Sequence, residues 1–404
     1  MMELLKIEEF AQTKAGGTPS TTVSEYWKNG NIPWLNSGAL NQGVVKSTSK
    51  FITKLGLEES STKLMPPDTI LIALTGATTG VIGYLTFEAC ANQSVVGILP
   101  SKRHFPKYLY YYLNLIRQKV LKDASGTAQP GINQKYVKNI QIPIPPLDEQ
   151  KHIVAKLDSC FEAIDKAHAN VEKNLNNAKE LFQSQLNQIF SQPALSEAEG
   201  KGNGWADKRI EEMTENVSKG SSPKWQGINY VENDGILFIT SENVGEAELL
   251  LHKKKYVEKK FNDKEKKSIL KKGDVLTNIV GASIGRTAIY DIDDIANINQ
   301  AVCVIRCNEN VLNNYYLMYL LNSPFFKTIL HENEVNNARA NLSLTFFRNL
   351  IIPIPNTTEQ QSIVEFIIDL KSQTQALESN YQQELAALDE LKKSILQKAF
   401  MGEL

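Results

Sequence analysis

One stretch of sequence occurs twice, as Ile142-Pro-Ile-Pro-Pro-Leu-Asp-Glu-Gln150 and, 210 positions later, as Ile352-Pro-Ile-Pro-Asn-Thr-Thr-Glu-Gln360. The similarity extends outward on both sides of this stretch. After it, Ile153-Val154 matches Ile363-Val364, and before it Asn92-Gln93 matches Asn299-Gln300 at a slightly smaller offset. Matches that keep their order over a whole half of the chain indicate a tandem duplication with small insertions.

Each copy of this stretch leads into a segment without proline or glycine, Leu147–Phe190 in the first half and Thr357–Phe400 in the second. Apolar residues recur at steps of three and four, which predicts two long helices with a coiled-coil-like seam. An ordinary core helix is the alternative, but the length and the polar opposite face argue against it. The predicted seam positions are Leu157, Phe161, Ile164, Val171, Leu175, Ala178, Phe182, Leu186, Ile189, Ile363, Ile367, Leu370, Leu377, Tyr381, Leu385, Leu388 and Ile395.

The remainder of each half mixes β-branched runs with glycine, proline and asparagine, which predicts an α+β globule with long loops. We therefore divide the chain into four parts: residues 1–146 and 206–356 as the two globular domains, 147–205 as a spacer helix and linker, and 357–404 as a C-terminal spacer helix. Small and polar residues predict the linker at Ser191–Gly204.

The order of these parts predicts that the second helix runs back along the first, because its apolar stripe needs a partner and the first helix is the nearest one. The fold class is therefore an α+β chain with two globular domains at opposite ends of an antiparallel two-helix spacer, related by a pseudo-twofold axis. A helix of this length spans roughly 65 Å. Half-sites on one face of DNA lie about 34 Å per helical turn apart, so such a spacer would set the distance between two DNA readers.

Composition limits where such a surface can lie. The 404-residue chain has a net charge of −1, so a nucleic-acid-binding surface must be local. Four scattered cysteines fit reduced thiols better than disulfides or a zinc site. No apolar run approaches the ~18 residues of a membrane-spanning helix, and we expect a cytoplasmic protein.

The architecture and motifs resemble the specificity subunits of type I restriction–modification systems. The resemblance rests on the repeated Pro-Ile-Pro…Glu-Gln stretch, on a Gly-rich loop followed by Asn-Gln in each half, and on two further segments, Ser125-Gly-Thr-Ala-Gln-Pro-Gly-Ile-Asn133 and Leu396-Gln-Lys-Ala-Phe-Met-Gly-Glu-Leu404. The second half departs from the pattern with Asn336-Asn-Ala-Arg-Ala-Asn-Leu342, which we interpret as a different specificity of the two halves.

The resemblance implies that each globule is a target-recognition domain that reads one half of a split, asymmetric site in double-stranded DNA. The helices would dock two modification subunits, which carry S-adenosylmethionine and methylate adenine, and restriction or translocase subunits could join. This chain would bind no cofactor or metal and catalyse nothing itself. Three alternatives stay open: the same role in another phage-defence methylation complex, a self-contained DNA methyltransferase, and a coiled-coil adaptor that binds only proteins.

The motifs of the chain do not support chemistry of its own. An adenine methyltransferase needs Asn/Asp-Pro-Pro followed by an aromatic residue, and neither Met65-Pro-Pro-Asp68 nor Ile144-Pro-Pro-Leu147 qualifies. Gly281-Ala-Ser-Ile-Gly-Arg-Thr287 is one residue short of a phosphate-binding loop and has arginine in place of lysine.

The Gly-rich loops fit DNA contacts better, because glycine lets backbone N–H groups approach phosphates and small hydroxyls donate without bulk. A tight turn with solvated hydroxyls is the alternative. The predicted contacts in these loops are Thr75, Thr78, Thr79, Asn278, Ser283 and Arg286.

Other loops supply further candidates. The repeated loops Gly16–Ser20 and Gly220–Trp225 either touch DNA or form proline-fixed turns, and Lys253–Lys272 holds ten lysines that either face solvent or neutralise phosphates. Gln129 could read adenine and Arg339 guanine. The remaining predicted contacts are Thr18, Ser20, Ser37, Ser221, Lys224, Ser241, Asn243 and Lys254.

Overall fold

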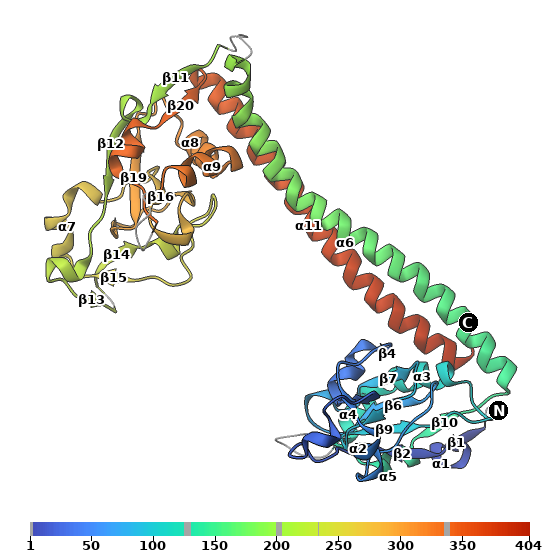
Figure 1. Cartoon of the computed structure of the whole chain (residues 1–404). Coiled ribbons are helices and arrows are strands. Elements are labelled where there is room, and N and C mark those ends of the chain that lie inside the picture. The colour runs from blue at the N-terminus through green and yellow to red at the C-terminus, as the bar shows by residue number, and fades with distance from the viewer. Residues whose placement is uncertain (1–2, 125–130, 199–203, 233, 335–339) are drawn as a thin grey trace. The chain divides into compact units, whose positions relative to one another are not determined.

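A computed structural model describes residues 3–124, 131–198, 204–232, 234–334 and 340–404, with the backbone alone for 192–198. The chain forms two compact units, one of Met1–Val171 with Gln383–Leu404 and one of Glu172–Gln382 (Figure 1). Each unit therefore contains one globular part together with segments of both long helices.

Unit 1 is built on a five-stranded sheet of order β2-β9-β6-β7-β4, beside a three-stranded sheet β5-β3-β8 and a pair β1-β10. Its strands are β1 (Leu4–Lys6), β2 (Thr13–Ala15), β3 (Ile32–Leu35), β4 (Val44–Val45), β5 (Phe51–Ile52), β6 (Ile70–Ala73), β7 (Ile82–Leu85), β8 (Cys90–Ala91), β9 (Val95–Ile98) and β10 (Gln141–Pro143). Its short helices are α1 (Ile7–Phe10), α2 (Lys54–Glu58), α3 (Pro106–Leu115), α4 (Arg117–Asp123) and α5 (Gln134–Asn139).

Unit 2 repeats this plan with sheets β12-β19-β16-β17 and β13-β15-β14-β18 and a pair β11-β20. Its strands are β11 (Ala206–Arg209), β12 (Thr214–Lys219), β13 (Tyr230–Val231), β14 (Ile236–Ile239), β15 (Tyr256–Val257), β16 (Val275–Asn278), β17 (Thr287–Ile289), β18 (Ala296–Ile298), β19 (Val302–Cys307) and β20 (Ile351–Ile354). Its short helices are α7 (Lys260–Lys264), α8 (Asn314–Asn322), α9 (Pro324–Glu332) and α10 (Leu344–Asn349).

The strand orders confirm the predicted α+β class and the internal repeat. In both units the first strand of the main sheet pairs with the last, β2 with β9 and β12 with β19. In both, a parallel pair forms in the second sheet, β3 with β8 and β14 with β18. Mixed sheets with the same parallel pair in the same place are not expected from two unrelated folds, so the duplication extends to topology.

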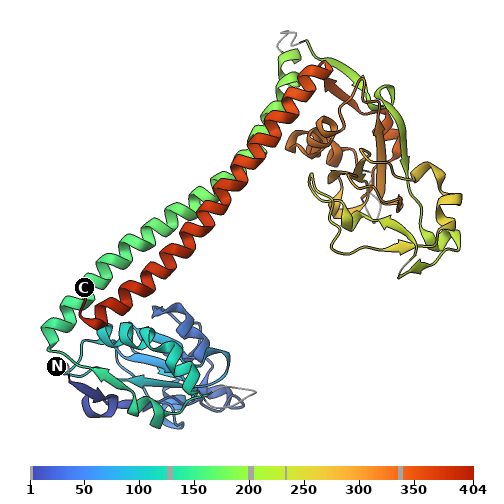
Figure 2. The same cartoon turned by 180° about the vertical axis from the view of Figure 1, so that it is seen from behind.

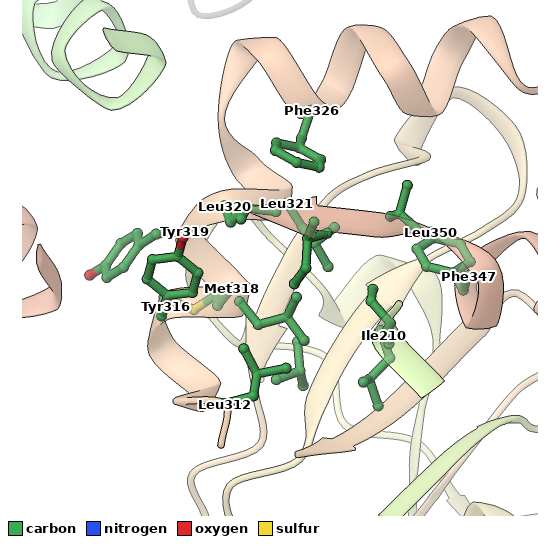
Figure 3. Close-up of a cluster of buried hydrophobic side chains, with 14 of the residues drawn as sticks. Ile210, Leu312, Tyr316, Met318, Tyr319, Leu320, Leu321, Phe326, Phe347 and Leu350 are labelled. Atoms are coloured by element: carbon green, nitrogen blue, oxygen red, sulfur yellow. The ribbon is translucent and has the colours of Figure 1, made fainter. Parts of the chain in front are cut away.

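The main core of unit 2 lies between the sheet β12-β19-β16-β17 and the helices α8, α9 and α10. Figure 3 shows Tyr316 and Leu320 of α8 and Phe326 of α9 in a cluster with Phe347 and Leu350. All of these side chains are buried. Because burial of such apolar area is the main favourable term in folding, this cluster fixes the sheet whose strand ends form the loops described below.

The two long helices are α6 (Leu147–Ala198) and α11 (Thr357–Met401), and both views show them paired (Figures 1 and 2). In unit 1 the early part of α6 packs on the late part of α11: Leu157 and Phe161 cluster with Ala399, and Lys392 Nζ lies 2.7 Å from Asp165 Oδ1. In unit 2 the late part of α6 packs on the early part of α11 in one core. Both pairings are antiparallel, as predicted.

Two details of the helix prediction were wrong. Ser191–Ala198, predicted as linker, continues α6 through Pro193. Leu377, predicted on the seam, is exposed, whereas Thr374 is buried and donates its hydroxyl to the Leu370 carbonyl at 2.9 Å. A threonine can occupy the seam because that bond satisfies its only donor.

The repeated Glu-Gln motif joins each long helix to its globular part. The buried Gln150 accepts from the Phe105 N–H at 2.7 Å and donates to the carbonyls of Arg103 at 3.1 Å and Pro145 at 2.8 Å. Gln360 is equally buried and makes the same three kinds of bond, accepting from the Asn313 N–H at 2.8 Å and donating to two carbonyls, each at 2.9 Å. The duplicated motif is thus a junction that fixes the first turn of each helix.

Candidate nucleic-acid interface

Several strands of unit 2 end at one edge of its two sheets. Lys219 at the end of β12 pairs with Cys303 near the start of β19, and Asn278 at the end of β16 pairs with Val302. The second sheet reaches the same place, because the Asn299 N–H after β18 donates to the carbonyl of Ile239 at the end of β14 at 3.0 Å. The loops that follow β12, β14, β16 and β18 therefore meet.

Hydrogen bonds connect these loops directly. Asn278 Nδ2 donates to the Ser241 carbonyl at 2.9 Å, which ties the Gly-rich loop of β16 to the loop of β14. The Gly281 N–H donates to the Ala340 carbonyl at 2.9 Å, which brings in the segment that follows α9. Gly281 and Gly285 have φ of 79° and 83°, a region that side chains rarely adopt, so the repeated glycines are required by this loop's shape.

Unit 1 forms the same loop cluster. The Asn92 N–H donates to the Leu35 carbonyl at 2.8 Å, and Thr75 is bridged to Gly131. The side chains also meet: Thr75 Oγ1 lies 2.9 Å from Ser94 Oγ, and the Thr18 hydroxyl donates to Gln93 Oε1. Two surfaces of matching construction therefore exist, one in each unit.

Most of the predicted contact residues lie on these loops with partly or fully exposed side chains. Thr18 and Thr75 come together in unit 1, whereas Ser37 begins the short helix that follows β3. In unit 2 the 252–255 segment is held by Asn243 Nδ2, which donates to the Lys253 carbonyl at 3.3 Å. The exposed or half-exposed candidates are Thr18, Ser20, Ser37, Thr75, Thr78, Ser221, Lys224, Ser241, Lys254, Ser283 and Arg286.

Three predicted contacts are buried. Thr79, Asn243 and Asn278 are 2%, 3% and 0% exposed. The Thr79 hydroxyl donates to the Gly76 carbonyl at 2.8 Å, and Asn243 Oδ1 accepts from the Thr240 N–H at 2.9 Å. These polar side chains hold the loops in shape, so we correct the prediction and leave them out of the proposed surface.

The two predicted base readers, Gln129 and Arg339, lie outside the described residues. Their neighbours are described: Gly131 pairs with Thr75, and Ala340 accepts from Gly281. Gly131 and Ala340 thus lie at the Gly-rich loop of their own unit.

The loop cluster also contains residues that were not predicted as contacts. Gln93 and Ser94 touch the predicted Thr18 and Thr75, and Gln300 follows the tied Asn299 in unit 2. The Asn-Gln pair that occurs in both halves of the sequence could have pointed to Gln93 and Gln300. A polar pair that both halves retain after a Gly-rich loop is expected at the same sheet edge as that loop.

Comparison with known proteins places this construction in a family. A family model described as the type I restriction modification DNA specificity domain matches residues 1–177 and 202–387. The chain belongs to this family. The match covers both halves and confirms the resemblance inferred from the repeated sequence.

Relatives within the family are distant but long. The type I restriction enzyme EcoBI specificity subunit of Escherichia coli is 25% identical over 356 residues, which cover 84% of this chain and 74% of that protein. The MjaVIII specificity subunit of Methanocaldococcus jannaschii is 25% identical over 409 residues, which cover 100% and 92%.

Solved structures show the same fold. The HsdS subunit from Thermoanaerobacter tengcongensis matches with a TM-score of 0.64 at 20% identity, over 100% of this chain and 97% of that one. A chain from work on complex assembly and conformational transition of the type I R-M system gives a TM-score of 0.72 at 20% identity, over 100% and 98%.

Charge on this specificity-domain chain is concentrated beside the loops of unit 2. Some lysines of the 253–272 run are paired with acids. Lys255 lies 3.0 Å from Glu242, and its hydrogen bond lowers the pKa of that carboxyl. Lys272 lies 3.2 Å from Asp293, and this hydrogen bond raises the pKa of the lysine. Six exposed lysines of the run have no acidic partner among the described residues: Lys253, Lys254, Lys264, Lys266, Lys267 and Lys271.

Other chemistry finds little support in the described part of the chain. No group of three His, Cys, Asp or Glu residues there is arranged to hold a metal ion. Burial raises the pKa of Cys90 to about 11 and that of Cys303 to about 12, which keeps both thiols protonated and unreactive at neutral pH. No helix in the described ranges has the length and apolar character needed to cross a bilayer.

Proposed function

We propose that this chain is the DNA-recognition subunit of a type I restriction–modification enzyme. Residues 1–146 and 206–356 each form a target-recognition domain that reads one half of a bipartite, asymmetric site in double-stranded DNA. The chain supplies recognition and no catalysis; the methyl donor S-adenosylmethionine is bound by modification subunits. Since the DNA of the host is the target, the chain works in the cytoplasm.

The observation that carries the proposal is the repeated loop cluster. The same strand ends meet in both units: Thr75 Oγ1 lies 2.9 Å from Ser94 Oγ in unit 1, and in unit 2 the buried Asn278 ties the loop that carries Ser283 and Arg286 to the Ser241 carbonyl. Hydroxyls, amides and backbone N–H groups are the donors that proteins direct at phosphates and base edges. Two such surfaces in one chain fit a site of two halves, and the family match supports DNA as the ligand.

The two loop clusters differ in the charged side chains that they present to a DNA ligand. Unit 2 has the lysine run and the exposed Arg286 in its Gly-rich loop, whereas Val81 stands at the matching position of unit 1. Lysine contacts to phosphate add affinity without sequence preference, while arginine can bind guanine with two hydrogen bonds. The proposal therefore assigns different half-site sequences to the two domains.

The long helices are proposed as the docking site for two adenine-methyltransferase subunits, with restriction or translocase subunits as further members of the complex. Their outer faces are predominantly polar, but Phe366 and Ile368 of α11 are 53% and 49% exposed. Large apolar side chains on an otherwise polar helix favour a protein partner. The predicted role of the helices as a ruler for the half-site spacing is part of this proposal.

The proposal is tested by methylation sequencing of a host that expresses this chain with its modification subunit. We expect an adenine motif in two parts, and exchange of residues 1–146 for the matching segment of another family member should change one part and leave the other intact. A one-part motif, or a change in both parts, would overturn it. Methyl transfer by the purified chain alone would instead favour a self-contained methyltransferase.

A second candidate, the same role in another phage-defence methylation complex, shares every feature of this surface. The genes beside the coding sequence discriminate between the two. A translocating restriction subunit encoded there supports a type I enzyme, and its replacement by other defence genes supports the alternative.

A further inference from the structure

Trp225 differs from the other three tryptophans of the chain. The indole N–H groups of Trp27, Trp34 and Trp205 donate to the Ser20 carbonyl, the Gly17 carbonyl and Glu359, respectively. Trp225 is 78% exposed, and its side chain makes no hydrogen bond or ring contact to the described residues. The fold of unit 2 therefore does not account for this side chain.

The loop that presents Trp225 is held firmly. The Gly227 N–H donates to the Lys224 carbonyl at 3.1 Å, and the Ile228 N–H donates to the Pro223 carbonyl at 2.9 Å. The side chain of Gln226 bonds Glu265 at 2.7 Å, and Lys264 bonds the Gln226 carbonyl at 2.7 Å. The backbone that carries the exposed indole is braced, so little backbone entropy is lost when the loop meets a ligand.

The base of this loop is part of the candidate interface. Gly220 begins the loop at the end of β12, and a Cβ there would lie 1.8 Å from the Ile298 carbonyl oxygen. The loop therefore packs directly against the end of β18, next to Asn299 and Gln300. Trp225 lies five residues from this contact, on the same group of loops that the proposed function assigns to DNA.

The charges around the loop favour DNA over a protein partner. Lys224 precedes Trp225, and Lys264, Lys266 and Lys267 follow on the neighbouring helix α7 and the turn after it, all exposed. Two acids lie among these lysines: Glu265, which accepts from Gln226 at 2.7 Å, and the exposed Asp263. Lysines still outnumber acids beside the ring, and this combination matches a polymer of stacked bases and phosphates, because the ring can stack while the lysines release counterions.

The first half of the chain has no counterpart. When Gly16 is matched with Gly220 and Pro19 with Pro223, Thr21 stands where Trp225 stands in the second half. Gly16 shows the same tight packing as Gly220, with a Cβ position 2.1 Å from the Asn92 carbonyl oxygen. The duplication thus retained the base of the loop and changed its tip.

We propose that Trp225 stacks on a base of the second half-site and partly withdraws that base from its neighbour, as apolar wedges do in other DNA-binding proteins. This inference rests on the proposed function and adds to it a contact that the first half-site lacks. The indole supplies the stacking surface, and the neighbouring lysines hold the flanking phosphates.

The test uses the full-length chain assembled with its modification subunit and a duplex that carries the site found by methylation sequencing. Trp225→Ala is expected to raise Kd by roughly 5- to 150-fold, the range for loss of one base–aromatic stack, whereas Trp225→Phe retains most of the affinity. 2-Aminopurine placed next to the stacked base should brighten with the wild-type complex, because it loses its stacking neighbour, and should stay quenched with Trp225→Ala. The methylated adenine is left unlabelled, because the modification subunit flips that base whether or not Trp225 is present.

Ile295→Ala is the matched control. Ile295 is 69% exposed in the same unit but precedes β18, at the end of that strand opposite to the loop cluster. Its replacement should leave Kd unchanged. Neither variant should alter the thermal unfolding followed by circular dichroism, because Trp225 makes no side-chain contact that folding requires.

The outcomes separate the inference from the proposed function. Specific binding by the wild-type complex together with an unaffected Trp225→Ala overturns the inference alone. Loss of the modification subunit from Trp225→Ala on size-exclusion chromatography assigns the indole to a protein contact and also overturns it. Absence of any specific binding by the wild-type complex overturns the proposed function, and the inference falls with it.

Discussion

Replacement of Gln150 by alanine should separate the first turn of α6 from its globular domain. The substitution removes three hydrogen bonds, one from the Phe105 N–H and two to the carbonyls of Arg103 and Pro145. A buried hydrogen bond contributes about 0.5–1.5 kcal/mol net, so the loss amounts to roughly 3 kcal/mol. The effect is large because the side chain is fully buried and water does not replace its bonds in the folded state.

Denaturation in guanidinium chloride measures the free energy of unfolding, and hydrogen exchange of the Phe105 amide reports the junction itself. We expect faster exchange at this amide in Gln150→Ala. Gln150→Glu keeps the volume and the acceptor for Phe105 but faces two carbonyl oxygens with a carboxylate, so it should also destabilise.

The control for this experiment is Lys151→Ala, next along the helix. Its ion pair with Asp148 is exposed, at 3.6 Å, so the variant should change stability by less than about 1 kcal/mol. The junction role would be refuted if Gln150→Ala lost less than about 1 kcal/mol of unfolding free energy and left exchange at the Phe105 amide unchanged. Removal of three buried hydrogen bonds must cost more than that.

Two further predictions concern charge. Lys266→Gln and Lys267→Gln each remove a lysine without an ion-pair partner, and each should reduce the slope of log Kd against log salt by up to about 0.9. Lys272 is already paired with Asp293, so Lys272→Gln should leave the slope unchanged. Equal effects of all three variants would contradict a phosphate role. Burial lowers the pKa of His104 to about 4. The unfolded chain therefore binds this proton near pH 6.5, before the folded chain does, and the stability of unit 1 should fall as the pH drops from 6.5 towards 4. Urea denaturation should show a less steep fall for His104→Gln than for the wild type or for the control His152→Gln.

Much of the fold could be predicted because duplication makes each half a check on the other. The starts of α6 and α11 at Leu147 and Thr357 lie where the two predicted helical segments begin. Helical periodicity is read from many residues at once, so one unusual residue does not obscure it. The end of α6 was missed for the opposite reason: Pro193 is a single residue typical of a helix end, yet α6 continues through it to Ala198.

The candidate site was predicted less well, because burial on a loop depends on what packs over it. Asn278 has the composition of a DNA contact, yet its amide donates to Ser241 in the next loop. The sequence shows that polar residues follow a strand, but not which of them bridge to a second strand end 37 positions away. Gln93 was overlooked in the same way, because its contact with Thr18 joins loops 75 positions apart.

Two duplicated DNA-binding domains can recognise different sequences only if the residues that contact DNA can change without change in the residues that maintain the fold. The residues common to both halves here are those with no freedom: Gly16 and Gly220 abut carbonyl oxygens, and Gln150 and Gln360 are fully bonded. Any change at these positions would cost the fold of one domain. The loop tips, in contrast, face solvent and tolerate change, as Thr21 against Trp225 shows. Separation of these two classes of residue along the same short loops is what would let one half-site change while the other, and the helices between them, stay as they are.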